Sequence, residues 1–264
     1  MSALTDGLAA LYGDNRRLIR ELFEYDRAVT FMLAVCIGAG EHEDDPESWL
    51  TIATLTELAA VMGIGPDRRV RRFVEEMRSD GHLIEVPMAG DRRRYRLQPS
   101  ERMLAIDREW CAAFHAPLAL LMPGVPRYEA AMAHDPAYHR RYRTAGLTTL
   151  RLARDAMWDH QPVDSFLHQA GGARVLAVLM QSGRGDDDGW SAPGFYTHGA
   201  ERSATTRAHV RGMLRNAASA GYVEIAETPT VRVRATRLLL DDYEAWVADS
   251  LSATDLVSTL TLSL

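Results

Sequence analysis

The 264-residue chain contains no lysine, so all 30 of its basic residues are arginine. A GC-rich genome explains such a bias, and the planar arginine fork also suits contacts with phosphate and guanine. Only two cysteines are present, Cys36 and Cys111, and each lies within an apolar helical pattern. This pattern favours two reduced core residues over a disulfide or a metal pair, with a redox sensor as the alternative.

The sequence also lacks long apolar runs and an N-terminal signal pattern. No run approaches the roughly 18 apolar residues of a membrane span. The N-terminus has no succession of basic, apolar and small residues. Apolar residues make up 47% of the chain and charged residues 25%, as in ordinary soluble proteins. We therefore expect a cytoplasmic bacterial protein, long enough for two small domains.

The motifs of the common catalytic classes are absent as well. There is no Gly-x-Gly-x-x-Gly, Walker loop, Gly-x-Ser-x-Gly or His-Glu-x-x-His. His42 in the acidic loop 41–48, and the pair His134 and His139, lack the arrangement of metal ligands. The glycine-rich residues 182–185 lack the helix start of a phosphate-binding loop. We expect no enzymatic activity, no metal and no cofactor.

What the sequence does contain is two basic segments. Residues 65–98 hold nine arginines against six acidic residues, and residues 202–237 hold seven against two. The net charge of −6 therefore comes from the rest of the chain. A local basic surface, rather than the total charge, attracts a phosphate backbone. The distribution favours nucleic acid as a partner.

The first basic segment is expected to form an amphipathic helix that begins after Pro66 and ends near Gly81. Its apolar residues recur at positions i, i+3, i+4 and i+7 of one face: Val70, Phe73, Val74 and Met77. Four arginines cover the rest of the helix. Arg68 and Arg72 are expected opposite Val70, with Arg69 and Arg71 on the flanks, since each residue turns the helix by about 100°.

Further elements are expected on either side of this helix. Residues 54–63 read as a preceding helix with a cap at Thr54 or Thr56, and residues 63–65 read as the turn between the two helices. Two strand-like runs follow, residues 83–86 and 95–97, and the polar residues 89–94 form the tip between them. Helix, turn, helix, strand, basic tip and strand is the order of a winged helix.

These residues resemble the MarR family of winged-helix transcription regulators. The wing of that family carries Asp-x-Arg, and Asp91-Arg92-Arg93 matches it, followed by a strand and a new helix from about Ser100. The resemblance implies a mainly α fold with small β-wings, an α+β class, in which terminal helices form a dimer. It also implies that Arg93 enters the minor groove of DNA and that Asp91 orients the wing.

The chain repeats itself at an offset of about 140 residues. Gly81-His82-Leu83-Ile84-Glu85 is echoed by Gly221-Tyr222-Val223-Glu224-Ile225, and the offset falls to 136 after the hairpins. Offsets that change only at loops and wings are typical of an ancient duplication. We predict two fused MarR-like units, residues 1–122 and 123–264. Their winged helices are expected at about residues 50–99 and 174–236.

Long helices are expected around the winged helices, at residues 6–37, 100–121 and 138–160. The resemblance implies that residues 6–37, 100–121 and 127–180 build an internal pseudo-dimer, so we expect a monomer with pseudo-two-fold symmetry. MarR-like regulators often sense small aromatic effectors. Five aromatic residues could line such a cleft, although aromatics at helical spacing are more often core: Tyr25, Phe31, Trp110, Phe114 and Trp246.

The candidate DNA-binding residues lie in both repeats. In the first repeat they are Arg68, Arg69, Arg71 and Arg72 on the helix and Arg92, Arg93 and Arg94 in the wing, with Asp91 as the wing-orienting residue. In the second repeat they are Thr205, Thr206, Arg207, His209, Arg211, Arg215, Arg232 and Arg234. The second wing lacks Asp-x-Arg, so either the halves should read different sequences or one half should contact the backbone while the other reads the bases; the operator should be asymmetric or imperfectly palindromic.

The resulting hypothesis is a transcription regulator that binds double-stranded DNA sequence-specifically. It would act as an intramolecular pseudo-dimer, with helices in the major groove and wings at the minor groove. Two alternatives remain open. One is a plasmid-type replication initiator, since such proteins also carry tandem winged helices. The other is a winged-helix module that binds protein, which the acidic remainder of the chain would suit.

Overall fold

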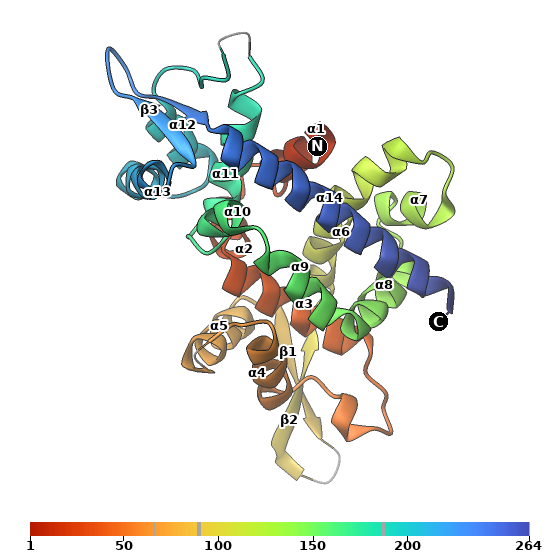
Figure 1. The fold of residues 1–264 in the computed structure, drawn as a ribbon. Helices are drawn as coiled ribbons and strands as arrows, with labels where there is room; N and C mark the ends of the chain where they lie inside the picture. Colours follow the sequence, from red (N-terminus) through yellow and green to blue (C-terminus); the bar gives the residue numbers. More distant parts are fainter. Residues whose placement is uncertain (66, 89–90, 186–187, 264) are drawn as a thin grey trace. The chain divides into compact units, whose positions relative to one another are not determined.

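The computed structural model describes residues 1–65, 67–88, 91–185 and 188–263, and within them not the side chains of residues 88, 91–94, 153 and 156–158. This part of the chain is mainly helical and contains two small antiparallel sheets of two strands each (Figure 1). The expectation of a mainly α protein with small β-sheets is therefore confirmed. No helix in the described ranges is both long and apolar enough to cross a membrane.

The chain forms two compact units, each assembled from segments that are distant in sequence. Unit 1 consists of residues 1–25 and 156–252, and unit 2 of residues 26–155 and 253–264. The boundary predicted after residue 122 separates two sequence repeats, not two compact units, and it stays a prediction. The compact units are divided elsewhere, because residues 1–25 belong to the same unit as residues 156–252, and residues 253–264 to the same unit as residues 26–155.

Unit 2 holds the first sheet and the central helices. Its elements are α3 (Tyr25–Ala39), the short 3-10 helix η1 (Pro46–Ser48), α4 (Ile52–Val61), α5 (Asp67–Ser79), β1 (Leu83–Met88), β2 (Asp91–Pro99), α6 (Glu101–Leu121), α7 (Pro126–Met132), α8 (Pro136–Thr148), most of α9 (Leu150–Trp158), the end of α14 (Arg237–Leu260) and η2 (Thr261–Ser263). Ser100 caps α6 by accepting a hydrogen bond from the Met103 amide at 3.2 Å. The helix expected at 100–121 is therefore confirmed.

Unit 1 holds the second sheet and the remaining helices. Its elements are α1 (Ser2–Ala10), α2 (Arg16–Leu22), α10 (Gln161–Leu167), α11 (Gly172–Ser182), α12 (Phe195–Arg202), α13 (Arg207–Ser219), β3 (Val223–Ala226), β4 (Arg232–Ala235) and most of α14. Thr206 caps α13 by accepting from the His209 amide at 3.1 Å. Helices α12 and α13 and the second sheet lie within residues 174–236, the range given for the second winged helix.

Two long helices expected from the sequence are wrong. Residues 6–37 form parts of α1, α2 and α3, because Tyr12 and Gly13 take positive φ angles of 64° and 52° and Asn15 caps a new helix. Residues 138–160 divide into α8 and α9, with the break at Thr149. The predicted caps of α4 are also wrong, since Thr51 caps that helix.

The two units share an order of elements. In unit 2, α3 is followed by α4, α5, β1, β2 and α6; in unit 1, α11 is followed by α12, α13, β3, β4 and α14. Leu83 pairs with Pro99, sixteen positions later, and Val223 pairs with Ala235, twelve positions later. The fall in offset from 140 to 136 therefore coincides with a second hairpin that is four residues shorter.

In each unit a backbone hydrogen bond joins the sheet to the segment that precedes α4 or α12. The sequence did not reveal this contact. The Leu97 amide of β2 donates to the Leu50 carbonyl at 2.8 Å. In unit 1 the Ser191 amide donates to the Val233 carbonyl of β4 at 2.9 Å. Both contacts tie the sheet to the residue just after a tryptophan, so the loop and the sheet are held together in both units.

Candidate nucleic-acid interface

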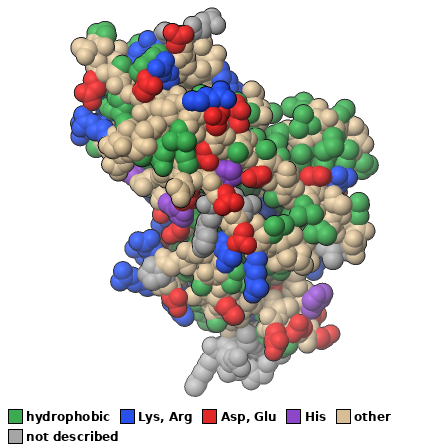
Figure 2. Space-filling model, viewed as in Figure 1, with side chains coloured by type: hydrophobic (Ala, Val, Ile, Leu, Met, Phe, Trp, Pro, Cys, Tyr) green, Lys and Arg blue, Asp and Glu red, His purple; other side chains and the backbone are tan. Residues whose placement is uncertain are grey.

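Helix α5 presents one buried face and one arginine-rich face. The four apolar residues expected to face the core are buried: Val70, Phe73, Val74 and Met77. The four arginines expected outside are all exposed: Arg68, Arg69, Arg71 and Arg72. Basic side chains project at the left edge of the molecule over α5 (Figure 2). The helical periodicity of the sequence therefore placed this surface correctly.

Neighbouring carboxylates divide these arginines into two pairs. Arg69 lies 3.6 Å from Asp26, and Arg72 lies 3.7 Å from Glu76. Glu76 also binds Arg27 at 2.9 Å. In the described ranges no carboxylate lies within 4.0 Å of Arg68 or Arg71. Arg68 and Arg71 therefore leave their guanidinium donors for an external acceptor.

The turn between α4 and α5 fixes the position of this face. Gly63 has a φ of 75°, a conformation that glycine adopts without strain. Ile64, which follows it, is buried, and its amide donates to the Ala59 carbonyl at 2.9 Å. With Ile64 anchored, the chain enters α5 with Val70 directed to the core and the arginines directed outward.

The hairpin of unit 2 reaches the predicted wing tip. Strands β1 and β2 pair from Leu83 and Pro99 to Met88 and Asp91, with an irregularity between Pro87 and Met88. The predicted wing residues Asp91, Arg92, Arg93 and Arg94 belong to β2, but their side chains lie outside the described residues. Their roles therefore stay predictions.

The base of the hairpin uses its arginines internally. Arg96 binds Glu41 at 2.9 Å and lies over the Trp49 ring, 5.4 Å from its centroid. Arg78 at the end of α5 binds both Glu75 and Glu85. These arginines contribute to the basic count of residues 65–98, yet their charges are compensated by carboxylates within the protein.

Helix α13 of unit 1 repeats the arrangement with fewer cations. Val210, Met213 and Leu214 are buried, and Ala208 and Gly212 are exposed. Arg207 and Arg211 are exposed and, in the described part of the chain, have no carboxylate within 4.0 Å. The Thr206 oxygen is engaged as the helix cap, and Thr205 before it is half-buried.

The other candidates in unit 1 have partners within the protein. His209 donates from Nε2 to the Ala170 carbonyl at 3.1 Å, and Arg215 binds Glu227 at 3.0 Å. Arg232 donates to the Ser191 carbonyl at 2.8 Å. Arg234 binds Glu224 at 2.6 Å and lies 4.8 Å from the centroid of the Trp190 ring. These four residues bind within the unit, which leaves Arg207 and Arg211 as the available cations among the arginines predicted to contact DNA there.

The five aromatic residues suggested for an effector cleft each pack against a neighbouring ring, and the effector itself stays a prediction. Trp110 and Phe114 stack on each other at 5.5 Å, while Phe31 is buried and packs edge-on against His82. Tyr25 packs against His168, and Trp246 stacks on Tyr243. Each aromatic residue is thus part of local packing, as the alternative interpretation proposed.

A buried cluster in unit 2 has the residue types of a metal site. Asp107, Cys111 and His139 bring one ligand atom each within 4.8 Å of one another. Arg143, however, occupies both carboxylate oxygens of Asp107, at 2.6 and 2.8 Å. Burial tends to raise the pKa of Asp107, but the Arg143 charge and the His139 hydrogen bond hold it below its ordinary value. The cluster is therefore a salt-bridge network in which arginine supplies the positive charge.

The two cysteines behave as core residues. Both thiols are free and buried, as expected. Burial raises the pKa of Cys36 to about 11 and raises that of Cys111 as well. Because the thiolate is the reactive form, neither residue has the environment of a reactive thiol.

Comparison with protein-family models, curated proteins and solved structures finds no match to this chain.

Proposed function

We propose that the protein is a transcription regulator that binds double-stranded DNA sequence-specifically through two winged-helix units. The observation that supports this most is on α5, where Arg68 and Arg71 are exposed and have no carboxylate within 4.0 Å among the residues that the structure describes, while the opposite face is packed into unit 2. A rigid helix with unpaired guanidinium groups suits contact with base edges and phosphates. This is also what the resemblance to MarR-like regulators implies.

In this proposal α5 enters the major groove, with α4 across the backbone. Arginine forms two hydrogen bonds with the O6 and N7 atoms of guanine, the commonest specific contact in that groove. Arg68 lies in the first turn of α5, where recognition helices contact bases. The wing residue Arg93 would enter the adjacent minor groove, where a narrow A·T-rich geometry deepens the negative potential.

The two units would contribute unequally. Arg207 and Arg211 on α13 are available, whereas Arg215, Arg232 and Arg234 are bound within the protein. The hairpin of unit 1 is also four residues shorter between its paired ends. We therefore expect unit 2 to provide most of the sequence readout and unit 1 mainly backbone contacts, which gives an asymmetric operator.

The test is selection of bound fragments from genomic DNA, followed by affinity measurements on the enriched site. Arg68→Ala, Arg71→Ala and Arg93→Ala should each weaken binding by about 5- to 150-fold. Arg141→Ala, which removes an exposed arginine from α8, is the matched control and should have little effect. Unchanged binding by all three variants would refute the site.

Salt dependence and footprint shape complete the test. The logarithm of affinity should fall linearly and steeply with the logarithm of salt concentration, since several phosphates are contacted. A perfectly symmetric footprint would contradict the unequal units. Failure to enrich any fragment would contradict DNA binding and favour a protein-binding module instead.

A further inference from the structure

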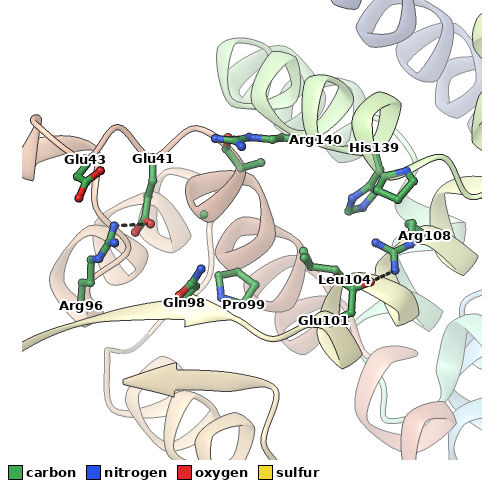
Figure 3. Close-up of a pocket in the computed structure, with 13 residues that line it drawn as sticks. Glu41, Glu43, Arg96, Gln98, Pro99, Glu101, Leu104, Arg108, His139 and Arg140 are labelled. Carbon is green, nitrogen blue, oxygen red and sulfur yellow. Dashed lines mark hydrogen bonds and ion pairs between the residues drawn. The ribbon is translucent and has the colours of Figure 1, made fainter. Parts of the chain in front are cut away.

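The ion pairs that join arginine to a carboxylate keep both charges throughout the physiological pH range. Two such pairs line a cleft in unit 2, Arg96 with Glu41 at 2.9 Å and Arg108 with Glu101 (Figure 3). Arginine stays protonated in proteins, and carboxyl groups ordinarily titrate at about pH 4. A contact whose charge changes between about pH 5 and 8 therefore requires a different cation, and histidine is the side chain that supplies it.

A histidine of this kind lies at the start of α10 in unit 1. His160 is the residue before this helix, and its side chain is buried. Its Nδ1 lies 3.2 Å from Oδ1 of Asp242, and its Nε2 lies 3.0 Å from Oδ2 of Asp249. Both carboxylates belong to α14 and stand two helical turns apart on the same face. The ring therefore has a carboxylate at each of its nitrogens.

The protonated ring satisfies both of these contacts, and the neutral ring satisfies one. Carboxylate oxygens accept hydrogen bonds, so each ring nitrogen must donate. A neutral imidazole has one N–H group, whereas the imidazolium has two. Neither carboxylate has an arginine within 4.0 Å among the residues that the structure describes. The compensating charge on this part of α14 therefore comes from His160.

The other charged groups around the ring are exposed or engaged elsewhere. Asp159, the preceding residue, is exposed, and Asp164 on α10 lies 3.1 Å from His168. Helices α11 and α13 also pack against α10. Their Arg174 and His209 donate to backbone carbonyls and form no hydrogen bond with the ring in the described part of the chain.

The two carboxylates on either side of the ring are held unequally. Oδ2 of Asp242 accepts from the Val163 amide in the first turn of α10 at 2.9 Å, and 14% of the Asp242 side chain is exposed. Asp249 has 56% of its side chain exposed and no other hydrogen-bond partner among the described residues. Water can therefore hydrate Asp249 when the ring loses a proton, whereas Asp242 would lose contacts that water does not reach. This difference favours a neutral ring that keeps its proton on Nδ1 and releases Asp249.

We propose that His160 and Asp249 form a pH-sensitive contact in unit 1, closed while the ring is protonated and open when it is neutral, with Asp242 as the fixed anchor. The contact joins two segments that connect the units. The chain enters unit 1 at residue 156, shortly before His160, and α14 leaves it after residue 252, shortly beyond Asp249. Loss of the proton removes one of the two contacts between these connecting segments. The proposal goes beyond DNA binding and does not depend on it.

The first experiment is NMR of the ring nitrogens in the full chain, labelled with nitrogen-15 histidine. The His160 signals are those that are missing from His160→Ala. At about pH 5.5 both nitrogens of this ring should carry a proton, and at about pH 8 only Nδ1 should carry one. A single proton at the lower pH, protons on both nitrogens at the higher pH, or a neutral ring protonated on Nε2 would overturn the proposal.

A double-mutant cycle identifies the partner that is released. His160→Ala and Asp249→Asn, alone and together, are compared by urea unfolding at about pH 5.5 and 8. Their effects on the unfolding equilibrium constant should be coupled by about 2- to 5-fold at the lower pH, the size usual for a partly exposed ion pair, and should be additive at the higher pH. His160→Ala and Asp242→Asn should be coupled at both pH values.

Glu244→Gln is the matched control for this cycle, because it removes an exposed carboxylate from the same helix. It should show no coupling with His160→Ala at either pH. Coupling of Asp249→Asn that is absent at the lower pH, or equal at both, would contradict the pH-sensitive contact. Coupling as large for Glu244→Gln would show that the general charge of α14, and not the contact, is responsible.

Discussion

Arg143 binds Asp107 with both arms of its guanidinium group, Nε to Oδ2 at 2.6 Å and Nη2 to Oδ1 at 2.8 Å. Both side chains are buried, and His139 donates to the same Oδ2. The pair joins α6 to α8. In a medium of low dielectric constant each charge depends on the other, because neither can be hydrated.

Arg143→Leu should therefore destabilise the protein strongly. It leaves the Asp107 carboxylate buried without its main compensating charge, a loss of about 3–5 kcal/mol in comparable pairs. Urea unfolding measures the change, with Arg141→Leu on the exposed side of α8 as the control. Adding Asp107→Leu should recover much of the loss. Equal stability of the Arg143 and Arg141 variants would show that the pair contributes little.

Stability should fall as the solution is acidified from about pH 6.5 toward 4. Burial lowers the pKa of His115 from 6.5 to about 4, so within this range the unfolded chain takes up a proton that the folded chain does not. The contribution of His115 to the free energy of unfolding is complete above the pKa that the residue has in the unfolded chain, and it amounts to about 3 kcal/mol at most. Urea unfolding at several pH values measures it.

His115→Gln is the matched variant, and it should flatten the pH dependence between 4 and 6.5. His115 is bonded to the Cys111 carbonyl at 2.7 Å and to Tyr138 and Ser258 at 2.9 Å, so the substitution also costs stability at neutral pH. An NMR titration of the unmodified protein provides a second reading. A His115 ring that titrates near 6.5 in the folded state would disprove the explanation.

Arg174→Lys should destabilise unit 1 although the charge is retained. The Arg174 guanidinium donates to the carbonyls of Leu8 and Leu11 at 2.6 and 2.8 Å. Both carbonyls lie at the C-terminal end of α1. Lysine cannot reproduce the planar fork, so at least one buried carbonyl loses its donor, at about 1–3 kcal/mol. Thermal unfolding measures the loss. Arg17→Lys, at an exposed position of α2, should leave the melting temperature unchanged.

Glu76→Gln should tighten DNA binding if the proposed function is correct. Glu76 lies 3.7 Å from Arg72, so its removal takes away the carboxylate that compensates this cation on the α5 face. We expect a several-fold gain in affinity and a salt dependence steeper by about one phosphate contact. Glu109→Gln makes the same change of net charge on α6 and serves as the control. A gain of equal size in both variants would indicate a general charge effect.

The local faces of helices were predictable from the sequence, since they depend on spacing alone. The buried positions of α5 and α13 follow a helical period, and the hairpins follow their turn residues. Helix ends were harder to place. The chain breaks at Tyr12 and Gly13, where Arg174 donates a hydrogen bond to the Leu11 carbonyl. Arg174 is more than 160 residues away, so no local pattern reveals this contact.

The ion pairs of the candidate arginines likewise could not be predicted from the spacing of residues in the sequence. Arg69 meets Asp26, and Arg215 meets Glu227, through contacts that the fold creates. One signal was present but was not used. Asp107 lies four residues from both Met103 and Cys111, so a charged residue stands within an apolar stripe. Such a residue requires a buried partner of opposite charge, and Arg143 provides it.

The division of each compact unit between distant segments has a consequence for biosynthesis. The core of unit 2 around Cys111 and Tyr142 includes Val257 and Leu260, so this unit is incomplete until the ribosome has passed these last turns of α14. Unit 1 likewise requires both residues 1–25 and residues up to 252. Neither unit can finish folding during most of translation. The nascent chain must keep its early helices from aggregating until their late partners emerge.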